Sequence, residues 1–136
     1  GRYYVDALWR PHSAAGYVIS YGPYVVYFAG DTGHDPETAR AIRQRFPRID
    51  VALIPVGPAD RPAWVHSLRK SVHAGPDEAV RLVDDVGAQW MVPIHFGTFF
   101  KATKGEQQAI SRAVAAHPRA AQVRQLRIGG AARFHY

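Results

Sequence analysis

The stretch YVVYFAGDTGH, residues 24–34, decides how this sequence is interpreted. Its first half, Tyr24–Phe28, consists of β-branched and aromatic residues, which favour a buried β-strand. Gly30 and Gly33 then flank Asp31, and glycines allow the backbone to turn sharply. The stretch therefore predicts a strand that ends in a tight loop, with a carboxylate directly after the strand.

The segments on either side extend this pattern. Downstream, residues 35–37 (Asp-Pro-Glu) supply an N-cap, a first-turn proline and an acidic residue for a helix that we expect to reach about Phe46. Upstream, Tyr17–Tyr21 has strand composition and is separated from Tyr24 by Gly22-Pro23, which predicts a hairpin.

The alternation of strands and helices continues to the end of the chain. It predicts strands at Val51–Val56 and Trp90–Ile94, helices from Pro76 to Gly87 and over Glu106–Ala116, and a closing strand pair, Gln122–Arg127 with Ala131–Tyr136. Such alternation is typical of a layered α/β unit. Pro55 and Pro93 fall in predicted strands, so each of these strands is expected to lie at a sheet edge or to end early.

Composition limits what this unit can be. The 136 residues, 47% of them hydrophobic, can bury one core, and no apolar run reaches the roughly 18 residues of a membrane helix. With no signal peptide visible, a soluble, cytoplasmic protein is expected. The absence of cysteine leaves imidazole and carboxylate as metal ligands. The net charge of +6 comes without an aromatic-interleaved basic motif, so no nucleic-acid partner is expected.

Three polar positions follow the apolar strands: Asp31, Gly57 and His95. The carboxyl ends of strands in α/β proteins meet at one edge, where ligands bind. The two oxygens of Asp31 can each contact a different metal ion. The alternatives stay open at this point, because Asp31 could only close an Asx-turn and His95 could be a hydrogen-bonded core residue.

Four segments in order carry a family resemblance: residues 27–33, 50–57, His73 with residues 76–80, and residues 93–99. Together they resemble the metallo-β-lactamase-fold hydrolases, within them the branch of N-acyl-phosphatidylethanolamine phospholipase D and the ascorbate-phosphate lactonase-like enzymes. The resemblance implies that residues 1–136 form one partial domain, the C-terminal half of an αβ/βα sandwich. It further implies a mixed sheet with helices on one face and an apolar opposite face that packs on the absent upstream half.

The resemblance also assigns roles to three residues. Asp31 matches the catalytic carboxylate that bridges two metal ions, and His95 matches the histidine that completes the ligand set of the second ion. His73 matches a catalytic, substrate-binding histidine that faces the scissile group; its alternative is an ordinary loop residue. The implied cofactors are two divalent metal ions, with zinc expected and manganese or iron able to accept the same ligands.

The family's His-x-His-x-Asp-His motif has no clear counterpart here. The chain is therefore expected to be inactive by itself and to belong to a metal-dependent hydrolase of phosphodiesters, lactones or related esters, acting on a small molecule or a phospholipid. The loop Pro58–Val72 is expected to shape substrate choice. The alternative is a non-catalytic binding or scaffold domain that kept the fold and lost the metals. The expected partner is the missing N-terminal half, with a homo-oligomer also open.

Overall fold

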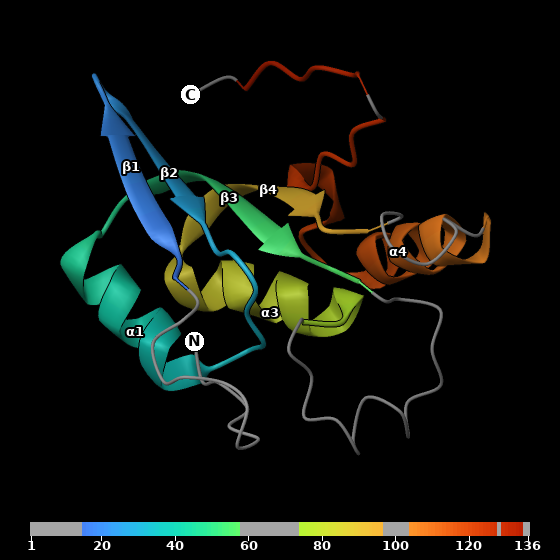
Figure 1. The fold of residues 1–136 in the computed structure, drawn as a ribbon, viewed down its shortest axis with the longest axis horizontal. Helices are drawn as coiled ribbons and strands as arrows, with labels where there is room; N and C mark the ends of the chain where they lie inside the picture. Colours follow the sequence, from blue (N-terminus) through green and yellow to red (C-terminus); the bar gives the residue numbers. More distant parts are fainter. Residues whose placement is uncertain (1–14, 58–73, 97–103, 128, 135–136) are drawn as a thin grey trace.

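A four-stranded mixed sheet organises the structure, a computed structural model that describes residues 15–57, 74–96, 104–127 and 129–134 (Figure 1). The strands run in the order β1-β2-β3-β4, with bounds Tyr17–Tyr21, Tyr24–Phe28, Ile49–Pro55 and Ala88–Ile94. β1 and β2 form an antiparallel hairpin, whereas β2, β3 and β4 are parallel neighbours. The predicted α/β class and mixed sheet are confirmed.

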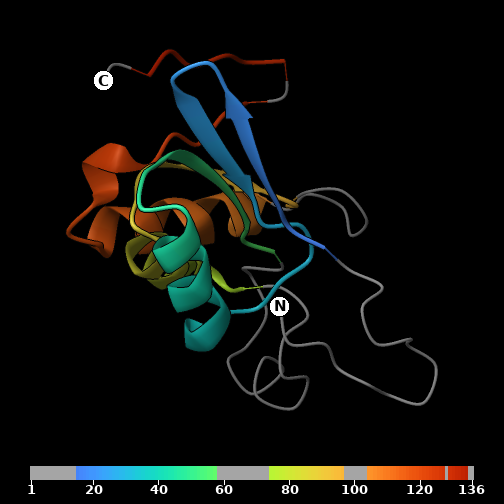
Figure 2. The same cartoon turned by 90° about the vertical axis from the view of Figure 1, so that its left-hand side faces the viewer.

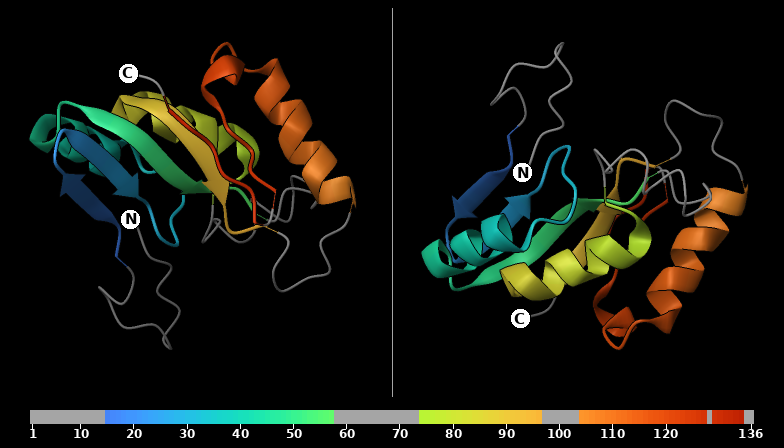
Figure 3. Two further views of the ribbon diagram at one scale, coloured as in Figure 1. Left: turned by 90° about the horizontal axis from the view of Figure 1, so that it is seen from above. Right: turned by 90° about the horizontal axis from the view of Figure 1, so that it is seen from below.

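The helices lie on one face of this sheet (Figure 3). α1 (Pro36–Arg45) connects β2 to β3, α3 (Pro76–Val86) precedes β4, and α4 (Lys104–Ala116) packs beside α3. Because parallel strands need long crossover connections, a covering helix between them is the expected arrangement. The core lies between these helices and the sheet and includes Ala39, Ile54, Val80, Val83, Val86 and Met91.

The opposite face of the sheet is apolar and largely open over β1 and β2. The register pairs Tyr17 with Phe28 and Ile19 with Val26, so these side chains share one face. Among the described residues, the large exposed hydrophobic side chains are those of Tyr17, Ile19, Tyr21, Tyr24 and Phe28, from 38% to 82% exposed. This agrees with the predicted apolar face, and we name these five residues the open sheet face.

The C-terminal segment covers the other half of that face, over β4 (Figures 2 and 3). Trp90 of β4 lies in the same cross-strand row as Val26 and Val51, and the ring of Phe134 packs on its indole with centroids 5.7 Å apart. The guanidinium of Arg124 lies 4.3 Å from the centroid of the Trp90 ring. A cation–π contact and an aromatic contact therefore hold this segment on β4.

The predicted closing strand pair, Gln122–Arg127 with Ala131–Tyr136, is wrong for the described part of these segments. Residues 120–122 form a short 3-10 helix, η1 (Ala120–Gln122), and Val123 makes a single parallel bridge to Met91. Residues 124–127 and 129–134 form no ladder. The physical reason is that this segment hydrogen-bonds and packs on β4 instead of pairing with itself, as the 2.8 Å bond from Arg124 N to Met91 O shows.

The proline positions follow the expectation. Pro55 is the last residue of β3, and Pro93 lies in β4, which is an edge strand of the sheet. An edge strand tolerates proline because one of its sides has no ladder partner that needs the missing N–H. Within the described part of the chain, no helix combines the length and apolar character that a membrane crossing requires.

A buried acidic side chain joins β2 to β3. Asp50 is 1% exposed, and its Oδ2 accepts a hydrogen bond from Val25 N at 2.7 Å, while Oδ1 accepts one from Arg48 Nε at 2.7 Å. The backbone ladder between the two strands begins at the next pair, Val26 with Val51. The carboxylate therefore satisfies a backbone donor where the ladder has not yet begun, and buried donors need such a partner.

We predict that Asp50→Ala lowers the free energy of unfolding by about 2–3 kcal/mol, because it leaves the Val25 N–H without its charged acceptor. Chemical denaturation of the variant measures this loss. The matched control is Asp77→Ala, which removes an exposed carboxylate from the first turn of α3 and should cost no more than about 1 kcal/mol. Equal losses in the two variants would contradict the role assigned to Asp50.

Candidate metal centre

Asp31 is placed by a turn that only glycine can make. The N–H of Ala29 still donates to Leu53 O at 3.0 Å, and the chain then turns at Gly30, whose φ is +65°. A Cβ atom at Gly30 would lie 2.5 Å from the carbonyl oxygen of Ala15, which is far inside van der Waals contact. The turn presents the Asp31 side chain, 58% exposed, at the carboxyl edge of the sheet.

His95 follows β4 directly at the same edge. The carbonyl of Ile94 accepts a hydrogen bond from Val56 N at 3.1 Å, so the strand stays paired up to the residue before the histidine. His95 itself has φ +60°, and no other non-glycine residue in the described ranges has a positive φ. This left-handed conformation costs roughly 1–2 kcal/mol for an L-residue, and such strain concentrates at functional sites.

The two side chains meet across the edge. His95 Nδ1 lies 3.5 Å from Asp31 Oδ1, with 30% and 58% of the two side chains exposed. Two ligands of one ion cannot have donor atoms more than about 4.4 Å apart, because each metal–ligand bond is about 2.0–2.2 Å. The pair meets this limit, which confirms the expectation that Asp31 and His95 share one edge. Their role as metal ligands stays a prediction.

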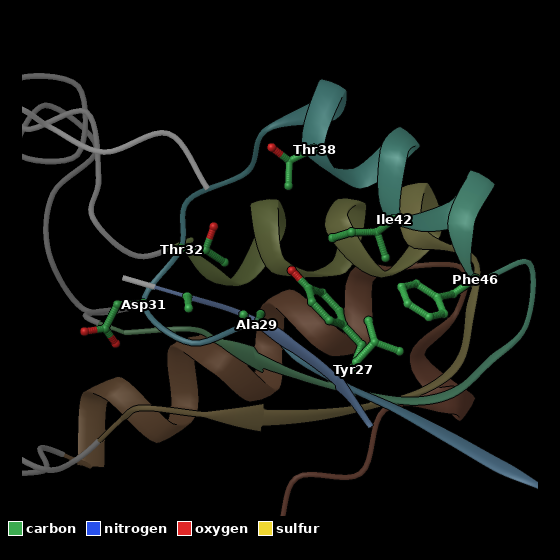
Figure 4. Close-up of a pocket in the computed structure, with 10 residues that line it drawn as sticks. Tyr27, Ala29, Asp31, Thr32, Thr38, Ile42 and Phe46 are labelled. Atoms are coloured by element: carbon green, nitrogen blue, oxygen red, sulfur yellow. The ribbon is translucent and has the colours of Figure 1, made fainter. Parts of the chain in front are cut away.

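The orientation of Asp31 bears on the Asx-turn alternative. In Figure 4 its carboxylate points away from Thr38 and the other side chains of α1. The N-cap position of α1 is occupied by Asp35, whose Oδ2 accepts a hydrogen bond from Thr38 Oγ1 at 2.7 Å. Asp31 is therefore directed away from α1, and the N-cap of that helix is a different residue.

Ala74 lies next to this site. Ala74 N donates to Thr32 O at 2.9 Å, which fixes residue 74 beside the Asp31 loop. His73 and the loop Pro58–Val72 lie outside the described residues, so the substrate-contact role of His73 stays a prediction.

Among the described residues, no third metal ligand lies beside this pair. In the described ranges, no group of three or more His, Asp or Glu side chains is arranged to hold a metal ion. His34 and His117 serve other purposes: His34 Nε2 lies 2.6 Å from Asp85 Oδ2, and His117 Nε2 lies 3.6 Å from Asp84 Oδ2. These contacts tie the Asp31–α1 connection and the end of α4 to α3. Sequence spacing gave no sign of either pairing.

Asp31 and His95 together could supply part of the ligand set of a divalent cation. A carboxylate and an imidazole are ligands that zinc accepts, and both lie on one edge within reach of one ion. A family model described as the beta-lactamase superfamily domain matches residues 2–96, a range that includes both residues. The chain belongs to this superfamily. Its fold is thus the metallo-β-lactamase type, and the predicted family is confirmed.

Relatives and solved structures agree with this assignment. The chain is 40% identical over 73 residues to N-acyl-phosphatidylethanolamine-hydrolyzing phospholipase D 1 of Caenorhabditis elegans, covering 54% of this chain and 19% of the worm protein. It is 38% identical over 89 residues to a UPF0173 metal-dependent hydrolase of Methanospirillum hungatei, covering 65% and 34%. The structure of Igni18, a metallo hydrolase of Ignicoccus hospitalis, matches with TM-score 0.55 and 23% identity, covering 82% of this chain and 41% of that one.

The chain is short compared with these superfamily members. It spans 23% of the length of a similar protein from Mycobacterium tuberculosis and 19% and 34% of the two relatives above.

We predict that His95→Gly is more stable than His95→Ala by about 1 kcal/mol, because glycine adopts a positive φ without the steric cost that alanine incurs. Denaturant unfolding measures the difference. Both variants of the full-length protein should lose bound zinc to the same extent, as measured by atomic absorption. Equal unfolding free energies would show that the backbone at residue 95 is not strained, and unchanged zinc content would remove His95 from the ligand set.

Proposed function

We propose that the protein to which this chain belongs is a metal-dependent hydrolase of phosphodiesters, lactones or related esters, with Asp31 and His95 among its metal ligands. The 3.5 Å approach of these two side chains carries the proposal. The superfamily of the chain and the metal-dependent hydrolase among its relatives support it. The phosphodiester is the favoured substrate class, because a relative 40% identical is named a phospholipase D.

The chemistry follows from the donor set. When bound, divalent ions lower the pKa of coordinated water toward neutrality and stabilise negative charge that develops on a phosphoryl or acyl group. Asp31 is the better candidate to bridge two ions, since it has two oxygens and is more than half exposed. His95 has one buried ring nitrogen on the Asp31 side and would bind a single ion. Zinc is the proposed metal, and manganese or iron fits the same ligands.

The remaining ligands are proposed to come from the upstream half of the same fold. The open sheet face supports this, because five large hydrophobic residues on one face of a four-stranded sheet form a surface of the kind that packs against another layer. On this proposal the chain is inactive by itself. His73 is proposed to contact the substrate without binding metal.

The second candidate is a non-catalytic scaffold that kept the fold. The observation that favours it is the incomplete ligand set in the described ranges, where only two donors meet at the sheet edge. The two candidates differ in one property: the hydrolase holds metal ions at Asp31, and the scaffold does not. Metal content therefore separates them before any substrate is known.

We predict that Asp31→Ala in the full-length protein reduces hydrolysis of bis(p-nitrophenyl) phosphate by at least about 100-fold, because loss of an outer-shell partner alone can cost 10–100-fold in a metal site. Bound zinc should fall in the same variant. His73→Ala should slow turnover and keep the metal. Glu37→Gln, an exposed carboxylate on α1, is the control and should change neither. Wild-type protein without bound metal and without activity would favour the scaffold.

We predict that Ile19→Lys in the full-length protein lowers the free energy of unfolding by about 2 kcal/mol or more, since it would place a charge where the upstream half packs. Gln44→Lys, on the exposed side of α1, is the matched control and should change stability by less than about 0.5 kcal/mol. Chemical denaturation compares the two. Equal effects would mean that the open sheet face stays exposed in the whole protein.

A further inference from the structure

A cavity of about 340 Å³ lies between α1 and the helix-covered face of the β1–β2 hairpin (Figure 4). Val18, Ile42 and Phe46 line its apolar part, and Thr32 and Thr38 line it as polar residues. Figure 4 shows the hydroxyl of Tyr27 directed toward the threonines and its ring toward Ile42 and Phe46. The volume is at the lower end of the roughly 300–1,000 Å³ of small-molecule pockets.

The cavity is divided into two chemical parts. The apolar part consists of side chains from α1 and the hairpin that already pack on the core: Val18, Ile42 and Phe46 are half-buried. An apolar ligand segment placed there would remove both its own surface and theirs from water, which is favourable in proportion to the area.

The two threonine oxygens in the polar part of the cavity can accept hydrogen bonds. Thr38 Oγ1 donates its proton to Asp35 Oδ2 at 2.7 Å, and Thr32 Oγ1 donates to Gly33 O at 3.0 Å. A hydroxyl has one proton and two lone pairs, so both oxygens keep acceptor capacity after these bonds. The carboxylate of Asp35, bonded to Thr38 at this end, disfavours an anion there.

We propose that this cavity binds a small amphipathic molecule: an alkyl chain that carries an uncharged or cationic hydrogen-bond-donating head group, such as a primary amide or amine. The alkyl chain lies against Ile42 and Phe46, and the head group donates to the oxygens of Thr32 and Thr38. The site adjoins the candidate metal centre: Asp31 belongs to the lining of the cavity, while its carboxylate points away from the cavity in Figure 4. The proposal does not depend on the hydrolase function.

The test uses NMR titration of the full chain with butanamide, pentanamide and hexanamide. Each added methylene buried in the apolar part should raise affinity about fourfold, which corresponds to about 0.8 kcal/mol per CH₂. Hexanoate, which has the same chain length and an anionic head that cannot donate, should bind at least about tenfold more weakly than hexanamide, because both threonine hydroxyls already donate their protons and the Asp35 carboxylate lies beside Thr38. Affinity that does not depend on chain length, or hexanoate binding equal to hexanamide binding, would overturn the proposal.

Two variants locate the binding. Ile42→Trp fills the apolar part and should reduce hexanamide affinity by at least about tenfold, while Gln44→Ala on the exposed side of the same helix should leave it unchanged. Circular dichroism checks that each variant is folded. Thr38→Val keeps the shape and removes one acceptor, so hexanamide affinity should fall about fivefold even if the tryptophan variant does not fold. Unchanged hexanamide affinity in Thr38→Val would place any binding elsewhere.

Discussion

The parallel pairing of β2, β3 and β4 is the constraint on which the rest of the structure depends. Because the three strands run in one direction, their carboxyl ends reach a single edge, and the residues that follow β2 and β4 become neighbours although they are distant in sequence. The helices are required by the same pairing, since each parallel connection must cross a face of the sheet. The position of the candidate site and the helices that connect the parallel strands are thus two results of one strand order.

The strands and their order in sequence could be predicted well, for a physical reason. Tyr17–Tyr21 and Tyr24–Phe28 are short runs of β-branched and aromatic residues bounded by turn residues, and local chemistry alone favours a hairpin there. The prediction of a C-terminal strand pair was wrong because residues of this segment pack on Trp90 instead of pairing with one another. That packing depends on the position of β4, and the sequence of the C-terminal segment alone does not indicate it.

The candidate site was predictable in part. Asp31 and His95 could be proposed because each directly follows an apolar strand, and the topology then brought them to 3.5 Å. The left-handed backbone conformation of His95 could not be predicted from the sequence, since histidine does not indicate a positive φ as glycine does. Asp50 was also missed, because a buried acid inside a strand looks the same in sequence as an exposed one until its backbone partner, Val25, is known.

The turn at Gly30 makes the site vulnerable at a position that has no chemistry of its own. Any side chain there would collide with the Ala15 carbonyl, so a replacement must displace either the Asp31 loop or the chain that enters β1. A change of the Gly30 codon would thus disturb the candidate metal centre while Asp31 and His95 both remained in the sequence. In this chain the residue before the aspartate therefore matters to the shape of the candidate centre as much as the aspartate itself.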